Sequence, residues 1–405
     1  MKIKVAVIGG GAAGFFSAIT AKENNPIADV VIFEKSTKLL AKVKISGGGR
    51  CNVTHDCKDP FTLATFYPRG GNYLKKAFQQ FHVADTLRWF EKRGIKMKTY
   101  PDGCIFPLSN DSQTIIDCFL NEAKRLGIRI QTSSGVTAIT KAGENYMLTV
   151  NNEQVLFDRV IITAGGQPKK SGLDWLSSLG LEIIDPVPSL FTFNMPNNPI
   201  CKLMGTVINP AMVKVEGTKL QATGPLLITH WGMSGPAILL LSAWGARVLH
   251  EKEYSFNILV NWLYEKGEDT LRKHFINMKV SNENKMMVNY SGLPLTQRLW
   301  EFLLEKAGVP TTMRWKDFGT KNENKLLATL LQDRYSVKGK TTFKEEFVTA
   351  GGISMMEVDV HRMEVKKYPG LHAAGEVLDI DGITGGFNFQ AAWTTGYIAG
   401  KSAVR

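Results

Sequence analysis

The first 35 residues alternate between apolar strand patterns and a helical pattern. The segment KIKVAVI (residues 2–8) is a short apolar run typical of a buried strand, and residues from Ala12 to about Glu23 have the Ala-rich spacing of a helix. A second apolar run, ADVVIFEK, follows directly. The order strand, helix, strand predicts a βαβ unit at the N-terminus and therefore a parallel sheet.

Later patterns predict more of this sheet and then a change of architecture. An amphipathic helix is expected from about Ser112 to Leu126, followed by the strand candidates RIQTSSGVTAI, YMLTVNN and RVIITAGG. The Pro-rich segment IDPVPSLFTFNMPNNP then marks the exit from the first domain. Residues 191–260 have β-rich patterns, whereas GLPLTQRLWEFLLEKAGVP and ENKLLATLLQDRY have helical spacing.

After Lys344 the chain returns to a Gly- and Ala-rich composition like that of the first domain. We therefore predict a discontinuous α/β domain, residues 1–190 and 346–405, whose sheet is completed by the C-terminus. An inserted β-rich domain is expected at residues 191–260 and about 335–345, and a helical subdomain at residues 261–334.

Composition excludes several classes of protein. The chain has 405 residues, of which 44% are hydrophobic, so it can bury a large core. Its five cysteines form no C-x-x-C pair, which argues against a disulfide scaffold or a structural metal site. The longest strongly apolar runs are far shorter than a membrane-spanning helix. We expect a cytoplasmic protein without a targeting signal, a bound metal or a membrane partner.

Positive charge is concentrated near the N-terminus. The net charge is +12, and the first 100 residues hold 17 Lys and Arg against 7 Asp and Glu. Aromatic residues lie among the basic ones in FYPRGGNYLKK and RWFEKRGIKMKTY. A protein that binds RNA through phosphate contacts and base stacking would need this pattern. The aromatic residues can also belong to the core of the first domain. Ribosomal RNA therefore stays open as a partner beside a small-molecule substrate.

The first candidate for chemistry is the glycine motif between the first strand and helix. Gly9, Gly11 and Gly14 form G-x-G-x-x-G, and Glu34 stands 20 residues past Gly14 at the end of the second strand. The glycines allow a tight turn and close approach of a pyrophosphate to the helix N-terminus, while the carboxylate accepts from ribose hydroxyls. An acid at this position favours FAD or NAD over a 2′-phosphorylated dinucleotide.

Further glycine turns favour FAD over NAD. These are TAGG at 163–166, AAGEVLD at 373–379 and GITGGFNFQ at 382–390. Gly385 and Gly386 are expected to open a helix whose N-terminal dipole faces the electron-rich end of a reduced flavin. Glu376 and Asp379 are candidates for the ribityl or pyrophosphate region, with helix capping as the alternative.

The segment SGGGRCNVTHDC (residues 46–57) has two interpretations. Cys51 and Cys57 suggest a redox-active pair, but disulfide reductases of the glutathione-reductase type have four residues between the cysteines and here there are five. We also find no second G-x-G-x-x-G and no C-terminal His-Glu dyad. The segment is better interpreted as a flavin-binding loop in which Arg50 contacts a phosphate or a flavin carbonyl.

Together, KISGGGRCNVT, TAGG, THWGMSGPAIL, FVTAGGISMMEV and PGLHAAGEVLDIDGITGGFNFQ resemble the BaiN-like, or aminoacetone-oxidase-type, family of FAD-binding oxidoreductases, with every block in order. The resemblance implies a discontinuous Rossmann-like FAD domain of the glutathione-reductase type with an inserted β-barrel-like domain and a small helical domain. It further implies non-covalent FAD contacts from Gly9, Gly11, Ala13, Gly14, Glu34, Lys35, Lys42, Ser46, Gly48, Arg50, Cys51, Asn52, Val136, Ala164, Gly165, Gly375, Glu376, Asp379, Gly386, Asn388 and Phe389.

The chain also departs from the family pattern. Members usually have Asn at the position of His55 and Tyr at that of Phe387, and a Gly-rich run after TAGG where this chain has KKSGLDWLSSLG. The last departure lies toward the substrate side, so it bears on specificity rather than on flavin binding.

Flavin chemistry without a disulfide or metal partner leaves hydride transfer through N5 as the expected reaction, with NAD(P)H as a transient reductant. Reduction of a C=C bond beside a carbonyl also needs a proton donor, for which Cys51, His55 and His230 are the candidates. The resemblance implies that the block containing His230, residues 229–232 and 234–236, lies over the flavin ring. The resemblance leaves three activities open: reduction of a 3-oxo bile-acid enone, amine oxidation, and dihydrouridine formation in 23S ribosomal RNA. A non-catalytic flavin-binding protein is the remaining alternative.

Overall fold

The computed structural model describes residues 2–342 and 348–405. Contacts within the chain divide these residues into two compact units, residues 2–189 with 348–405, and residues 190–342. The expected return of the chain to the first domain at about residues 345–346 lies outside the described residues.

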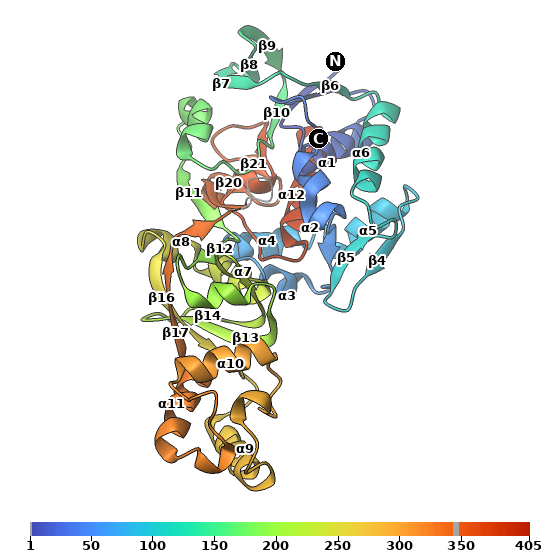
Figure 1. Ribbon diagram of the computed structural model, residues 1–405. Helices are drawn as coiled ribbons and strands as arrows, with labels where there is room; N and C mark the ends of the chain where they lie inside the picture. Colours follow the sequence, from blue (N-terminus) through green and yellow to red (C-terminus); the bar gives the residue numbers. More distant parts are fainter. Residues whose placement is uncertain (1, 343–347) are drawn as a thin grey trace. The chain divides into compact units, whose positions relative to one another are not determined.

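A seven-stranded sheet forms the centre of the first unit (Figure 1). Its order is β20–β21–β22–β10–β1–β2–β6, and the pairs from β22 to β6 are all parallel. Strand β22 comes from the C-terminal part of the chain and completes the sheet beside β10, which confirms the discontinuous Rossmann-like α/β fold. The strands are β1 Lys4–Ile8, β2 Asp29–Phe33, β6 Arg129–Gln131, β10 Arg159–Ile162, β20 Val358–Asp359, β21 Glu364–Val365 and β22 Leu371–Ala373.

Helices α1 (Ala12–Asn24) and α12 (Phe387–Ala403) pack closely against each other. Two glycines of α12 permit this approach. A Cβ at Gly400 would lie 2.3 Å from the carbonyl oxygen of Ser17, and one at Gly396 would lie 2.9 Å from that of Ala13. The C-terminal helix is thereby held against the helix that begins at the predicted dinucleotide motif.

The predicted helices at residues 12–23 and 112–126 are confirmed as α1 and α6. Helix α6 spans Gln113–Arg125. The α-helices between α1 and α6 are shorter: α2 Ala41–Gly49, α3 Pro60–Ala64, α4 Gly71–Ala77 and α5 Val83–Glu91. The 3-10 helices of the unit are η1 Lys170–Leu179, η5 Met355–Glu357 and η6 Gly375–Val377.

The strand candidate RIQTSSGVTAI is two strands rather than one. Strand β6 ends at Gln131 in the central sheet, and β7 begins at Val136 in a separate antiparallel sheet. Between them the backbone turns at Ser133, whose φ is +51°, and Ser134 donates its N–H to the carbonyl oxygen of Glu34. A left-handed residue inside the run breaks the strand.

Three small sheets complete the first unit. The hairpin strands β7 Val136–Ala142, β8 Asn145–Val150 and β9 Glu153–Phe157 form one, and β3 Thr54–His55, β5 Cys104–Pro107 and β4 Met97–Thr99 form another. The third pairs β11 (Ile183–Ser189) with β19 (Val348–Ile353) in antiparallel orientation. In the described part of the chain, no helix has the length and hydrophobicity needed to cross a lipid bilayer.

The second unit contains a seven-stranded sheet with the order β17–β16–β13–β14–β15–β12–β18. Its edge strands β17 and β18 are separated along the chain by Gly339 alone, so the sheet curls until its two edges meet. The strands are β12 Thr192–Asn194, β13 Val207–Val215, β14 Gln221–Thr229, β15 Gly232–Ser234, β16 Ser255–Asn261, β17 Asp333–Lys338 and β18 Lys340–Thr341.

Along the chain, the helices of the second unit lie between the strands of this sheet. Phe275 of α9, Trp300 of α10 and Trp315 of η4 are buried in the same core as the strands. The elements are η2 Pro199–Leu203, α7 Pro236–Trp244, α8 Ala246–Glu251, α9 Glu268–Ser281, η3 Met287–Asn289, α10 Gln297–Lys306, η4 Trp315–Asp317 and α11 Thr320–Leu331.

Candidate functional site

The turn between β1 and α1 contains glycines with different physical roles. Gly9 has φ +114°, and a Cβ there would lie 2.3 Å from the carbonyl oxygen of Thr163; a Cβ at Gly14 would lie 2.0 Å from that of Gly9. The protein's own packing therefore requires these two glycines. Gly11 has an ordinary φ of −94°, and no atom of the described residues lies within 4 Å of a Cβ built there. The absence of a side chain at Gly11 leaves room for something other than this chain.

The first turn of α1 is suited to a pyrophosphate. No side chain caps the helix at Gly11, so its leading N–H groups can donate to an anion. Ala13 is buried on this turn, and its Cβ lies 2.7 Å from the position of a Cβ at Gly375, whose φ is +76°. The α1 N-terminus and the 373–379 segment are thus adjacent, as a shared cofactor requires.

Glu34 stands at the end of β2, beside this turn. Its Oε2 accepts the N–H of Gly10 and its Oε1 accepts that of Ser36, each at 2.8 Å. Each carboxylate oxygen has a further lone pair for a ribose hydroxyl. Lys35 is exposed, and its Cβ is 3.4 Å from the position of a Cβ at Gly135, next to the predicted adenine contact Val136.

The predicted flavin-binding loop interrupts helix α2. Ser46 has extended backbone, and Gly47, Gly48 and Gly49 are left-handed, with φ of +58°, +69° and +83°. Consecutive left-handed residues can turn backbone N–H groups toward a common anion. A Cβ at Gly48 or Gly49 would meet no atom of the described residues within 4 Å. This loop, like Gly11, leaves space that the protein itself does not fill.

Arg50 and Asn52 are held in place by this loop and its neighbours. Arg50 donates from Nε to the carbonyl oxygen of Gly47 at 3.0 Å, and its guanidinium lies 4.3 Å from the centroid of the Phe106 ring. In the amide orientation that satisfies its surroundings, Asn52 donates to the carbonyl oxygen of Thr54 and accepts the N–H of Gly386. Asn52 therefore joins the 46–52 loop to the start of α12.

The C-terminal candidates form two groups. Glu376 accepts Lys42 Nζ on Oε2 at 2.5 Å and the N–H of Thr349 on Oε1 at 2.9 Å. Asn388 exchanges two hydrogen bonds with the backbone of Gly382, at 2.8 and 2.9 Å. Helix α12 begins after Gly386, whose φ is +92°, without a side-chain cap, as the sequence predicted.

The remaining predicted contacts differ in exposure. Ala164 packs against the core of the first unit, and Gly165 is left-handed with no described atom near its Cβ position. Asp379 is half-buried. Phe389 stacks on Trp393 with ring centroids 5.5 Å apart.

The three candidate proton donors have different environments. Cys51 is fully buried, and burial raises the pKa of its thiol to about 12, against a smaller opposing effect from Ser46. His55 lies 3.1 Å from the carbonyl oxygen of Gly385 through Nδ1, which fixes Nδ1 as the protonated nitrogen. His230 is exposed on the turn between β14 and β15 and lies edge-on to Trp231. Cys51 and His55 belong to the first unit and His230 to the second.

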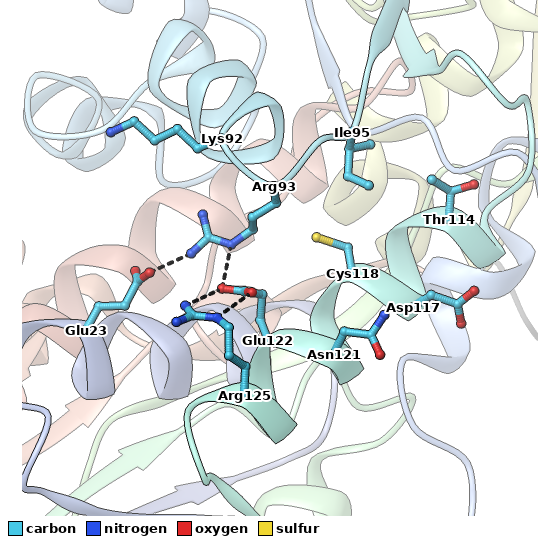
Figure 2. Close-up of a pocket in the computed structure, with 10 residues that line it drawn as sticks. All are labelled: Glu23, Lys92, Arg93, Ile95, Thr114, Asp117, Cys118, Asn121, Glu122 and Arg125. Atoms are coloured by element: carbon cyan, nitrogen blue, oxygen red, sulfur yellow. Dashed lines mark hydrogen bonds and ion pairs between the residues drawn. The ribbon is translucent and has the colours of Figure 1, made fainter.

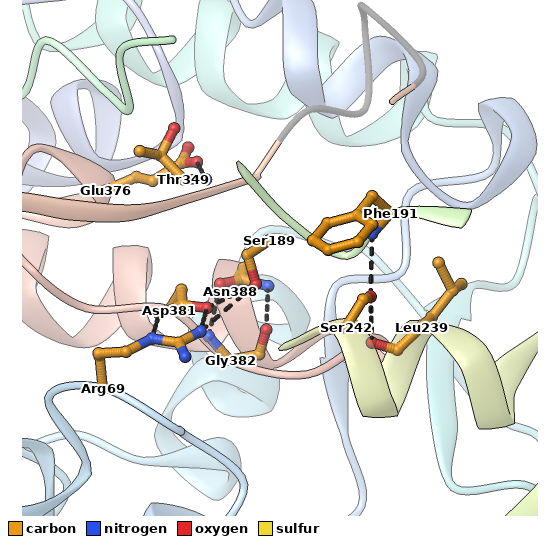
Figure 3. A network of polar contacts seen from close by, with 10 residues as sticks. All are labelled: Arg69, Ser189, Phe191, Leu239, Ser242, Thr349, Glu376, Asp381, Gly382 and Asn388. Carbon is orange, nitrogen blue, oxygen red and sulfur yellow. Dashed lines mark hydrogen bonds and ion pairs between the residues drawn. The ribbon is translucent and has the colours of Figure 1, made fainter. Parts of the chain in front are cut away.

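Two buried polar groups were not predicted. Gln390 on α12 accepts hydrogen bonds from the hydroxyl groups of Thr54 and Thr86 at 2.6 and 3.0 Å. Asp381 is fully buried and accepts hydrogen bonds from Arg69 and from Ser189 (Figure 3). Burial raises the pKa of Asp381, and the guanidinium and hydroxyl oppose this rise. The sequence signal for Asp381 was the pair of aspartates in DIDG, residues 379–382, and the glycine motif beside it was interpreted instead.

An open pocket of about 570 Å³ lies elsewhere in the first unit, and Figure 2 shows its lining. Arg93 crosses it, contacting Glu23 at 2.6 Å and Glu122 at 3.1 Å, and its guanidinium lies 3.5 Å from the Trp89 ring centroid. The Arg93 side chain is only 10% exposed. Its charge is therefore neutralised within the protein, and it is unsuited to a phosphate contact.

The aromatic residues of the two basic segments are mostly core residues. Tyr67, Trp89 and Phe90 are buried, and Phe66 and Tyr73 pack half-buried against the same core. Lys75 and Lys76 on α4 are exposed. The two basic segments therefore present exposed lysines to solvent, but few exposed aromatic rings on which RNA bases could stack.

The comparison with protein-family models decides the classification, because the model described as HI0933-like protein Rossmann domain matches residues 3–402. The chain belongs to the HI0933-like family. The family expected from the sequence blocks is confirmed, and with it a flavoprotein oxidoreductase with a Rossmann-type FAD-binding domain.

This member of the HI0933-like family is similar to two curated relatives along nearly its whole length. It is 27% identical over 417 residues to a 3-dehydro-bile acid delta(4,6)-reductase of Clostridium scindens, covering 99% of both chains. It is 26% identical over 408 residues to a ribosomal RNA dihydrouridine synthase of Escherichia coli, covering 98% of this chain and 97% of the relative. Neither name decides what this chain acts on.

Solved structures show the same fold at lower identity. A 3-ketosteroid-delta4-(5alpha)-dehydrogenase from Rhodococcus jostii RHA1 superimposes with a TM-score of 0.53 at 13% identity, covering 100% of this chain and 97% of that one. A quinol-fumarate reductase superimposes with a TM-score of 0.51 at 14% identity, covering 100% of this chain and 71% of that one. At these identities the likeness concerns fold alone.

Proposed function

We propose that this protein uses FAD to reduce a C=C bond conjugated to a carbonyl, with NAD(P)H as the source of hydride. The observation that carries the flavin assignment is the open space beside Gly11, where neither backbone conformation nor packing demands a glycine. The substrate class is supported by the full-length similarity to a bile-acid enone reductase. In the overall reaction, NAD(P)H supplies a hydride and solvent a proton; the C=C π bond breaks, two C–H bonds form, and NAD(P)⁺ leaves.

The residues of the first unit would hold the cofactor at three places. The N-terminus of α1 would bind the pyrophosphate, Glu34 the ribose hydroxyls, and the left-handed glycines with Arg50 the region near the isoalloxazine. Bound FAD supplies hydride transfer between the nicotinamide and the substrate. The protein's part is to exclude water, orient the acceptor and deliver the proton.

We propose His230 as the proton donor. Cys51 is fully buried with a pKa of about 12, so it holds its proton at neutral pH too tightly for an efficient acid. His55 already donates to Gly385, and its Nε2 is 2.5 Å from the position of a Cβ at Gly103, so backbone covers that nitrogen. The exposed His230 is the candidate whose ring is open to a ligand.

The test begins with purified protein under anaerobic conditions. NADH or NADPH should bleach the flavin band near 450 nm, and a 3-oxo-Δ4 steroid should restore it while gaining two hydrogens by mass spectrometry. His230→Ala should lower kcat at unchanged FAD content and unchanged bleaching by NAD(P)H. The exposed His250 in the same unit provides the matched control His250→Ala. If no enone reoxidises the reduced flavin, the proposed substrate class is rejected.

Dihydrouridine formation in ribosomal RNA is the second candidate, supported by the Escherichia coli relative and by the exposed Lys75 and Lys76. Uracil contains the same conjugated C=C–C=O unit, so the hydride chemistry is unchanged. Under this alternative, 23S ribosomal RNA should restore the flavin band, and the double reversal Lys75→Glu, Lys76→Glu should weaken RNA binding and flatten its salt dependence. The same reversal should leave turnover of a neutral enone unaltered.

A further inference from the structure

The buried carboxylate of Asp381 joins two distant segments of the first unit. Arg69 donates to it from Nε at 2.5 Å and from Nη2, and Ser189 donates its hydroxyl to Oδ2 at 2.8 Å (Figure 3). The exposed fraction of the Asp381 side chain is 0%, and that of Arg69 is 12%. Ser189 is the last residue of β11, which pairs with β19.

Further contacts hold the surrounding backbone. Residues 66–70 run beside residues 380–387: the backbones of Arg69 and Asp381 form an antiparallel bridge, and Ile383 donates its N–H to the carbonyl oxygen of Phe66 at 3.0 Å. Tyr67 donates its hydroxyl to the carbonyl oxygen of Phe387 at 2.6 Å. The 380–387 segment is thus fixed at both ends and leads directly into the first turn of α12.

Stability alone is a weak explanation for this ion pair. Removing two charges from water costs several kcal/mol per ion, and well-packed apolar residues often replace buried ion pairs without loss. A bidentate guanidinium–carboxylate contact does, however, fix direction as well as distance. The pair is suited to defining where the Gly382–Gly386 loop lies.

We propose that Arg69 and Ser189, acting through Asp381, position the Gly382–Gly386 loop so that the N-terminus of α12 is presented to the FAD ring. Asp381 is then a positioning residue that sets the reduction potential of the flavin. The 17-residue α12 has no side-chain cap, so the positive end of its dipole is available to negative charge gathering on the reduced ring. This inference rests on the FAD site proposed above.

The test compares two buried aspartates. Asp381→Asn keeps the shape and removes the charge that aligns Arg69. The matched control is Asp333→Asn in the second unit, where an equally buried carboxylate accepts from Trp262 and Tyr335 and pairs with Lys306. The midpoint potential of bound FAD, measured by anaerobic dye titration, should fall in Asp381→Asn by at least 30 mV, a tenfold change in the equilibrium for two electrons. In Asp333→Asn the melting temperature should fall and the potential should not.

Ser189→Ala keeps the proposal testable if Asp381→Asn does not fold, because it removes one hydroxyl and leaves the ion pair. It should shift the potential in the same direction by a smaller amount, with stoichiometric FAD. The positioning role would be overturned if folded, FAD-loaded Asp381→Asn had an unchanged potential. If that variant does not fold, an unchanged potential in Ser189→Ala would overturn it. So would an equal shift in Asp333→Asn. Wild-type protein that binds no FAD would instead reject the proposed function itself.

Discussion

The imidazole of His55 lies over the ring of Phe387, with centroids 4.6 Å apart and planes 26° from parallel. These are two of the positions at which the resemblance drawn from the sequence leads us to expect other residues. His55 is on β3 and Phe387 opens α12, so the two departures, 332 positions apart in the chain, meet in one contact. We interpret them as a coupled pair that fixes α12 against the 46–57 segment.

A double-mutant cycle tests this coupling. His55→Ala and Phe387→Leu should show an interaction energy of about 1 kcal/mol in urea unfolding, since stacked rings contribute roughly this amount beyond their burial. The control combines His55→Ala with Phe275→Leu, which removes a buried ring in the other unit and should be additive within ~0.5 kcal/mol. Additivity in both cycles would contradict the coupling.

Two glycine substitutions separate cofactor binding from folding. Gly11→Val should fold with a melting temperature close to wild type and lose FAD, because its side chain enters space that the protein leaves empty. Gly14→Ala should be strongly destabilised, because its Cβ would lie 2.0 Å from the carbonyl oxygen of Gly9. Absorbance at 450 nm per chain and thermal unfolding measure the two effects. Stoichiometric FAD in folded Gly11→Val would reject the pyrophosphate assignment.

Cys51 should be unreactive in the native protein. Its thiol is fully buried with a pKa of about 12, so almost none is thiolate at pH 8. Iodoacetamide labelling followed by peptide mass spectrometry should modify the half-buried Cys104 well before Cys51. Cys57→Ser should leave flavin reduction and reoxidation unaltered. Rapid labelling of Cys51, or a Cys51–Cys57 disulfide that cycles with the flavin, would support the redox-pair interpretation instead.

His372 should make stability depend on pH. His372 is buried on β22, and its Nδ1 donates to the carbonyl oxygen of Arg362. Burial lowers its pKa from 6.5 to about 4. The charge of Glu364 opposes this fall, and the charges of Arg362 and Arg159 add to it. Between pH 6.5 and 4 the unfolded state binds a proton that the folded state does not, so stability is lost as the pH falls through this range.

The comparison of wild type with His372→Gln isolates this contribution. The wild-type protein should lose about 1 kcal/mol more than the variant between pH 7.5 and 5.5 in urea unfolding. The exposed His361 supplies the control His361→Gln, which should follow the wild-type profile. Parallel profiles for wild type and His372→Gln would contradict the prediction.

Charge reversal at Arg93 should act on folding rather than on RNA. Arg93→Glu removes the partner of Glu23 and Glu122 and should cost on the order of 3 kcal/mol of unfolding free energy. Lys92→Glu, on the exposed neighbouring residue, should change it by less than ~0.5 kcal/mol. Equal effects of the two reversals would show that the Arg93 contacts contribute nothing measurable.

The sequence was sufficient to predict the elements whose signals are local. A turn that needs glycines at fixed spacing, an apolar strand and a buried helix are each encoded in adjacent residues, so the βαβ unit, Glu34 at the end of β2, and the opening of α12 at Gly386 could be predicted before the structure was known. The break between β6 and β7 was missed, because nothing in the sequence shows that Ser133 is left-handed.

Tertiary structure alone decided which residues meet. Arg69 and Asp381 are 312 positions apart, and no periodicity links the turn around Arg69 to the loop before the last helix. Packing likewise decided that Arg93 is neutralised by Glu23 and Glu122 and that Trp89 and Phe90 are core residues. Among the three glycines of the motif, it showed that a Cβ at Gly11 would enter empty space, whereas one at Gly9 or Gly14 would meet backbone. The physical reason is that burial and ion pairing depend on neighbours brought together by the fold, whereas backbone conformation is largely a property of adjacent residues.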